Sequence, residues 1–221
     1  MSYLPALEEL DQDGAIQEIA EKVDGDTRAS FLRKAGLGTG AVLGGGVIAG
    51  ALPAIAGAAS SRDVAILNFA LTLEYLEAAF YNEAVRQGRF SGEVGTFASV
   101  VASHENAHVK FLKGALGSSA VKKPKFNFMG TTTDEAKFKA TAKALEDTGV
   151  SAYLGQVGRI QSKKILRAAG SILPIEARHA AWIRDIIGSG NDPKPAPSAF
   201  EGARTKAQVL AIVKATGFIV G

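Results

Sequence analysis

The chain has 221 residues, a net charge of +3 and no cysteine, and this length suits one globular domain with appendages. The absence of cysteine excludes disulfides, thiol catalysis and cysteine-bound zinc or iron, so any metal ion must be bound through oxygen and nitrogen. The basic residues are spread along the chain without interleaved aromatic residues, which predicts a solvated surface and no nucleic-acid partner.

The first quarter of the chain predicts export. Residues 1–26 form an acidic extension, and residues 27–60 are interpreted as an export signal or membrane anchor. No charged residue occurs in 35–60, which is long enough to span a bilayer, and eight glycines between positions 36 and 57 disfavour a buried core helix. We expect a protein of the periplasm or cell envelope that contacts the membrane only through residues 35–59, if the signal stays uncleaved.

The route of export is indicated by residues 27–34, which read TRASFLRK. Their hydroxyl residue, arginine, phenylalanine, leucine and following basic residues resemble a twin-arginine export signal. Ala29 stands where the second arginine of that signal is expected. General secretion and an uncleaved anchor therefore remain alternatives to twin-arginine export.

Apolar residues then recur at spacings of three and four, which predicts helices. The four predicted long helices are residues 63–86, 93–116, 134–156 and 159–187. Short turns at 88–92 and 155–158 predict antiparallel neighbours, and residues 117–133 form a longer crossover. The predicted fold is all-α: an antiparallel four-helix bundle over residues 61–188 with a long crossover between the second and third helices.

Two features concern the carboxyl-terminal part of the chain. Pro174 falls inside the fourth predicted helix, so we expect a kink there or a restart of the helix near Ser171. Residues 189–221 form a proline-rich tail with a short helix at 205–216. That helix is expected to pack on the bundle or to contact a partner.

The helices contain a hidden repeat. At an offset of 72 residues, three residues of the first helix recur in the third: Leu73, Glu74 and Tyr81 match Leu145, Glu146 and Tyr153. At an offset of 71, a Glu-x-x-His motif of the second helix recurs in the fourth: Glu105 and His108 match Glu176 and His179. The two halves of the bundle are therefore expected to be related by an approximate two-fold axis and to share one site.

The repeated polar residues predict a metal site. Residues three apart lie on one face of a helix, so each Glu-x-x-His motif can direct a carboxylate and an imidazole to one ion. Two such motifs, with one glutamate from each other helix, form the ligand set of carboxylate-bridged di-metal bundles. The predicted ligands are Glu74, Glu105, His108, Glu146, Glu176 and His179. Oxygen ligands with two imidazoles favour two iron or manganese ions, and the alternative is a hydrogen-bonded cluster without metal.

Further residues are expected around these ligands. Glu77, Tyr81 and Tyr153 are predicted to support them, with Glu77 also a candidate extra ligand. The repeat favours Glu74 over Glu77 as a ligand. His104 is expected to be a surface or helix-contact residue, and Trp182 to pack in the core.

Three stretches resemble the bacterial ferritin-like domain family, which includes plant desiccation-related proteins. They are residues 73–81 (LEYLEAAFY), 104–108 (HENAH) and 175–181 (IEARHAA). The resemblance extends over about residues 63–218. It implies a ferritin-like bundle, a twin-arginine signal and a di-metal site.

Three functions follow as hypotheses. The first is a di-iron or di-manganese oxidoreductase that acts on dioxygen or hydrogen peroxide, as an oxidase or a catalase or peroxidase; no residue is assigned as catalytic. The second is a non-enzymatic envelope or stress protein of the desiccation type, whose tail contacts partners. The third is iron storage, which requires a homo-oligomeric shell.

Overall fold

The computed structural model describes residues 59–188 and 195–220. The predicted acidic extension and nearly all of the predicted export signal lie outside the described residues. The same holds for residues 189–194 of the predicted tail.

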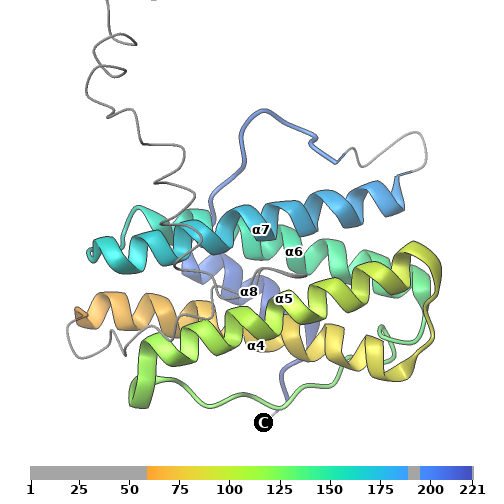
Figure 1. Ribbon diagram of the computed structural model, residues 1–221, viewed down its shortest axis with the longest axis horizontal. Coiled ribbons are helices and arrows are strands. Elements are labelled where there is room, and N and C mark those ends of the chain that lie inside the picture. The colour runs from red at the N-terminus through yellow and green to blue at the C-terminus, as the bar shows by residue number, and fades with distance from the viewer. Residues whose placement is uncertain (1–58, 189–194, 221) are drawn as a thin grey trace, which may run out of the picture. The chain divides into compact units, whose positions relative to one another are not determined.

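Four long helices form the bundle: α4 (Ser61–Gln87), α5 (Gly92–Leu116), α6 (Glu135–Val157) and α7 (Lys163–Ile187). α4 pairs with α5, α6 pairs with α7, and contacts of α5 with α7 and of α4 with α6 join the two pairs (Figure 1). Within the described ranges there is no strand apart from one isolated bridge between Phe126 and Ile219. The predicted all-α, ferritin-like bundle is confirmed.

The helix bounds follow from local caps. The Ser60 hydroxyl accepts the N–H of Asp63 at 3.1 Å, and the Asp134 carboxylate accepts that of Lys137 at 2.9 Å, so α4 and α6 both begin with a capped first turn. Gly88 ends α4 with a φ of 61°, in the left-handed region that favours glycine. Each of these ends lies within two residues of the predicted one.

The start of α7 differs most from the prediction, at Lys163 rather than 159. The buried carboxylate of Asp63 accepts the backbone N–H groups of Gln161 and Ser162, both at 2.9 Å. These contacts use two N–H groups that precede the helix, and Ser162 then caps its first turn. The prediction missed this start because Asp63 lies about a hundred residues earlier in the chain.

α7 continues through Pro174, so the predicted restart near Ser171 is wrong. Proline has no N–H, and the carbonyl of Gly170 therefore loses its helical partner. Pro174 and Gly170 are both exposed, which lets water hydrate that carbonyl. The helix consequently tolerates proline on its outer face.

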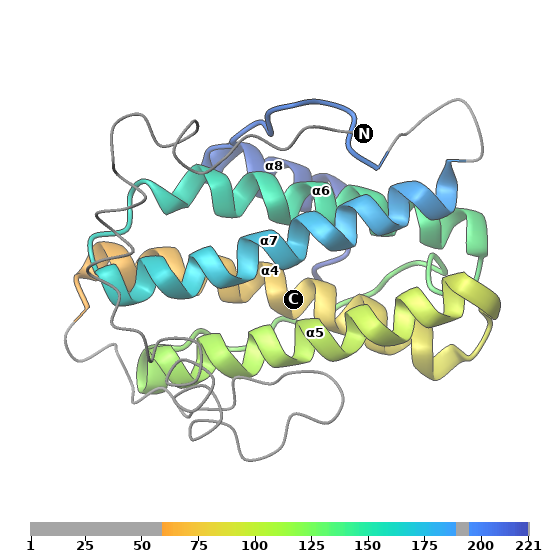
Figure 2. The same cartoon turned by 45° about the horizontal axis from the view of Figure 1, so that its top comes forward.

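The crossover after α5 begins with the short 3₁₀ helix η2 (Gly117–Ser119), and the tail ends in α8 (Lys206–Thr216). α8 starts with a capping box between Thr205 and Gln208. It contacts α6 (Figures 1 and 2) and contributes Val209 and Val213 to the core. Of the two predictions for the tail helix, packing on the bundle is the one observed.

Two apolar clusters occupy the opposite ends of the bundle. One gathers aromatic rings, among them Phe80, Phe97 and Phe138, and the other is mainly aliphatic, with Leu71 and Leu112. α4 is long and apolar enough to cross a membrane, but most of its apolar stretch is buried in the bundle. It is therefore read as a core helix. The polar residues described next lie between the two clusters.

Candidate metal centre

Buried charged side chains meet in the middle of the bundle. Glu74, Glu105, Glu146 and Glu176, one from each long helix, are all 0% exposed, and His179 is 2% exposed. Burying carboxylates in an apolar bundle is costly unless they are paired or bind a cation. All six predicted ligands, including the partly buried His108, lie in this cluster.

One group of ligand atoms surrounds His108. Its Nδ1 lies 3.2 Å from Glu74 Oε2, 3.3 Å from Glu105 Oε2 and 3.1 Å from Glu176 Oε1. The four residues each offer one ligand atom within 4.8 Å of the others. This is the spacing needed for four atoms to surround one ion.

A second group surrounds His179. Its Nδ1 lies 3.2 Å from Glu105 Oε1 and 3.3 Å from Glu146 Oε2, and Glu176 completes the group within the same 4.8 Å limit. Glu105 and Glu176 thus belong to both groups. Glu105 turns one carboxylate oxygen toward each histidine, which is the arrangement of a carboxylate that bridges two ions.

Several of these atoms lack hydrogen-bond partners. Among the described residues, neither oxygen of Glu176 accepts a hydrogen bond, and Glu105 Oε1, Glu146 Oε2 and His179 Nδ1 are also unpaired. Buried polar atoms are nearly always paired in proteins. The unpaired atoms belong to the two groups above, and four carboxylates balance the charge of two divalent cations. The residues present therefore fit a pair of metal ions.

Two tyrosines hold the remaining glutamates, each across the bundle. The Tyr81 hydroxyl donates to Glu146 Oε1 at 2.5 Å, and the Tyr153 hydroxyl donates to Glu74 Oε1. Each hydrogen bond occupies Oε1 and leaves Oε2 facing a histidine. The structure thus places both tyrosines where the sequence expected supporting residues.

Glu77 lies beside the cluster but in neither group of ligand atoms. It is 3% exposed, and its Oε1 lies 3.2 Å from the position of a Cβ added at Gly149, which would also be 3.1 Å from Glu176 Oε2. Gly149 is the counterpart of Glu77 at the offset of 72 residues. Glycine at this position leaves room for a fifth carboxyl group that the other half of the repeat does not have.

His104 also contacts the cluster, and this contact between α5 and α7 agrees with the predicted surface or helix-contact residue. The His104 Nδ1 lies 2.8 Å from the His179 Nε2, and the two rings stack with centroids 5.1 Å apart. His104 is exposed on its other side. A hydrogen bond at Nε2 fixes the His179 ring so that Nδ1 faces the carboxylates.

Burial and mutual repulsion shift the pKa values of the buried glutamates. Burial, with the nearby Glu105 charge, raises the pKa of Glu176 to about 8. Burial likewise raises the pKa values of Glu74 and Glu77 well above their usual range. Burial alone would also raise the pKa of Glu105, but the close imidazoles of His108 and His179 hold it well below its usual range. Near pH 7, Glu105 is therefore charged and Glu176 protonated.

The pKa values of the two histidines are raised, although burial alone would lower them. Burial alone would lower the pKa of His179, but Glu146 and Glu105 raise it to about 10. Burial alone would lower the pKa of His108 as well, but the Glu74 charge and the close carboxyl groups of Glu105 and Glu176 raise it. The metal-free cluster therefore stores protons on imidazoles that a metal ion requires in neutral form.

These shifts predict that metal binding releases protons. At pH 7, Glu176 and His179 must each lose a proton to bind a cation, so we expect about two or more protons released per chain and an affinity that falls as the pH is lowered. Calorimetric titration with Mn²⁺ in buffers of different ionisation enthalpy measures this number. A titration with no buffer dependence would contradict the assignment of these two residues as ligands.

His104 should matter for metal affinity although it is not a ligand. We expect His104→Ala to weaken metal binding about 10- to 100-fold by freeing the His179 ring. The neighbouring exposed Ser103 offers a control, because Ser103→Ala should leave the affinity unchanged. Equal affinities in the two variants, measured by competition with a chelator, would show that the histidine contact has no role in ligand orientation.

The comparisons with known proteins agree with the fold. Residues 62–189, more than half of the chain, match the family model described as "Ferritin-like domain". The match spans α4 to α7 and all six candidate ligands. No curated protein matches the chain. The chain belongs to the ferritin-like domain family.

Proposed function

We propose that this protein binds two iron or two manganese ions and acts on dioxygen or hydrogen peroxide. The observation that supports the proposal is the sharing of Glu105 and Glu176 between two buried groups of ligand atoms. Glu74 with His108 would complete one ion's ligands, and Glu146 with His179 the other's. A pair of such ions supplies two electrons to, or accepts two from, one bound oxygen species.

The protein's own residues would set the conditions for this chemistry. Tyr81 and Tyr153 would hold Glu146 and Glu74, the two glutamates that belong to only one group of ligand atoms each. Glu77 has a pKa raised by burial and by neighbouring acids, which favours its neutral form beside the ligand carboxyl groups. The apolar clusters at both ends of the bundle exclude bulk water from the site.

Metal content and turnover test the proposal together. We expect protein purified without chelators to hold about two iron or manganese ions per chain. The loaded protein should consume dioxygen when reduced, or release oxygen from hydrogen peroxide. Many irons per chain with negligible turnover would favour iron storage instead, and a chain that takes up no metal would favour a non-enzymatic envelope or stress protein.

We also propose that the protein is exported to the periplasm or cell envelope. The support is the sequence TRASFLRK at residues 27–34, followed by the uncharged stretch 35–60. Twin-arginine transport carries folded proteins, and metal bound before transport would be protected from competing ions outside. Replacement of Arg28 by lysine should reduce the exported fraction in a fractionation assay, and an unchanged fraction would remove the twin-arginine route.

A further inference from the structure

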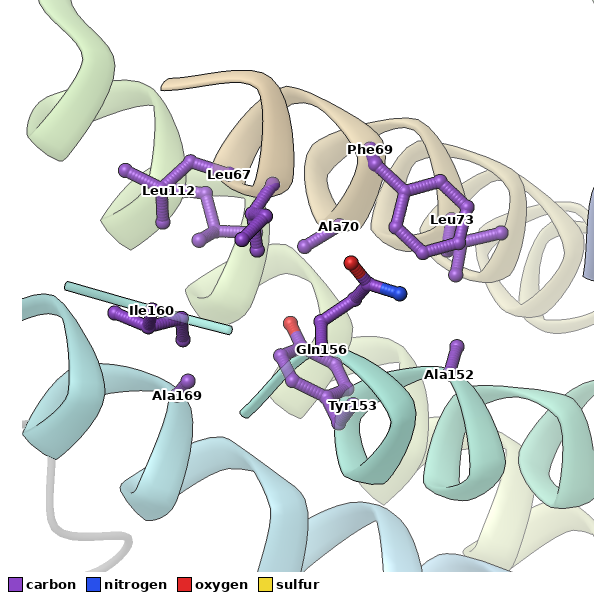
Figure 3. A pocket seen from close by; sticks show the side chains of 11 residues that line it. Leu67, Phe69, Ala70, Leu73, Leu112, Ala152, Tyr153, Gln156, Ile160 and Ala169 are labelled. Atoms are coloured by element: carbon purple, nitrogen blue, oxygen red, sulfur yellow. The ribbon is translucent and has the colours of Figure 1, made fainter. Parts of the chain in front are cut away.

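A small cavity lies inside the bundle beside the candidate metal centre (Figure 3). Its volume of about 20 Å³ leaves room for one small molecule. Its wall includes Ala70 and Leu73 of α4, Tyr153 and Gln156 of α6, and Ala169 of α7. Both halves of the bundle therefore contribute residues to its wall.

Tyr153 joins this cavity to the ligands. Its ring lines the cavity, and its hydroxyl donates to Glu74. Two further wall residues lie one helical turn from ligands: Ala70 precedes Glu74 by four residues, and Leu112 follows His108 by four. A molecule in the cavity would thus be separated from the metal centre by little more than one phenol ring.

The equivalent tyrosine in the other half is closely packed by aromatic rings. Tyr81 is 0% exposed and packs edge-on against Phe80, Phe97 and Phe138, with ring centroids 5.1 to 6.0 Å apart. The sequence repeat would otherwise give the two tyrosines similar surroundings. The cavity is thus a departure from the two-fold symmetry, at one of the two tyrosines that hold ligands.

The polarity of the cavity wall determines which small molecule the cavity can hold. The wall is apolar apart from Tyr153, whose hydroxyl is engaged with Glu74, and Gln156, whose side chain reaches into the cavity (Figure 3). Gln156 is 5% exposed, and its Nε2 has no hydrogen-bond partner within the described part of the chain. A buried water needs two to four polar partners, and hydrogen peroxide has two donors to satisfy. Dioxygen needs no polar partner.

We propose that this cavity holds dioxygen next to the metal centre and that dioxygen, rather than hydrogen peroxide, is the oxidant taken from this side. The inference rests on the proposed function and narrows its substrate. The wall exposes almost no polar surface to the cavity, so binding there needs no hydrogen bond and favours dioxygen over hydrogen peroxide.

The first test does not depend on metal. Xenon binds apolar cavities of proteins, and crystals of this protein kept under xenon pressure should show a xenon atom between Tyr153, Gln156 and Ala169. Crystals of Ala169→Leu, in which the larger side chain fills the space, should show none. Absence of xenon from the unsubstituted protein would overturn the inference while leaving the proposed metal centre intact.

The second test measures the rate of oxidation. We expect Ala169→Leu, loaded with ferrous iron to the same content as the unsubstituted protein, to react with dioxygen at least about tenfold more slowly. Its reaction with hydrogen peroxide should stay within about twofold. Ala136→Leu, on the exposed face of α6, is the matched control and should change neither rate.

The outcomes separate this inference from the proposed function. An unchanged rate with dioxygen, or an equal loss with both oxidants, would overturn the selective cavity while the metal centre stands. Failure of the unsubstituted protein to bind iron would overturn the proposed function, and the inference with it. Ala70→Val fills the cavity from α4 and should repeat the dioxygen effect if Ala169→Leu does not fold.

Discussion

Replacement of Glu176 by glutamine is expected to remove both metal ions from the protein at once. Glu176 offers an atom to each group of ligands, so its loss takes one negatively charged ligand from both ions. By contrast, Glu74→Gln should remove or weaken only the ion beside His108. Metal analysis after gel filtration should give close to no metal for the first variant and about one ion per chain for the second.

The same substitution should leave the metal-free fold intact. The pKa of Glu176 is about 8, so near pH 7 its side chain is mostly the neutral acid, and glutamine has the same shape. We expect the melting temperature of metal-free Glu176→Gln to lie within about 2 °C of that of the unsubstituted protein. Glu135→Gln, at an exposed position of α6, is the control and should keep both ions. Two ions retained in Glu176→Gln would contradict a bridging role.

Removal of metal is expected to lower the melting temperature by about 5–10 °C. A ligand present at a hundred times its dissociation constant stabilises the native state by about 2.7 kcal/mol, and in a domain of this size each kcal/mol shifts melting by about 2–4 °C. The physical source is the binding itself, because only the folded chain brings the four buried ligand carboxyl groups together around the ions. Thermal melting with and without a chelator measures the shift.

A matched control distinguishes loss of the site from general effects of the chelator. Glu176→Gln should melt at the same temperature with and without chelator, because it holds no ion to remove. Glu135→Gln should show the full shift. A chelator shift of equal size in both variants would place the stabilising metal outside the cluster.

Much of the fold could be predicted because the patterns that specify it are local. Apolar spacing and caps such as Ser60 and Asp134 specify helix ends within a few residues. The start of α7 was missed because Asp63 supplies its N–H partners from a distant part of the chain. Pro174 was expected to kink α7 or to make it restart near Ser171, and there is no restart because exposure on the outer face makes the helix tolerant of proline.

The candidate site was partly predictable for a similar reason. The repeat and the Glu-x-x-His spacing selected six residues that the structure brings together, and Glu77 lies beside them rather than among the ligand atoms. The crossed pairing of Tyr81 with Glu146, and of Tyr153 with Glu74, depends on how the helices face each other. The contact of His104 with His179 needs the packing of α5 on α7. The spacing of residues along one helix predicts neither the tyrosine pairing nor the histidine contact.

The departures from the repeat bear on function. Glu77 faces Gly149 where symmetry would place a second glutamate, His104 supports only His179, and the cavity borders only Tyr153 of the two tyrosines described above. Each departure makes the surroundings of the two groups of ligand atoms unequal. Two ions bound there would differ in affinity and in access to substrate, which would suit a reactive centre better than a symmetric structural one.

The most direct test of the central claim is anomalous X-ray diffraction from crystals of the protein loaded with iron or manganese. The predicted result is two anomalous peaks about 3.5–4 Å apart in the bundle centre. One should touch His108 and Glu74, the other His179 and Glu146, and both should touch Glu105 and Glu176. A bundle centre without any anomalous peak, with metal bound only at the surface, would contradict the proposed di-metal site.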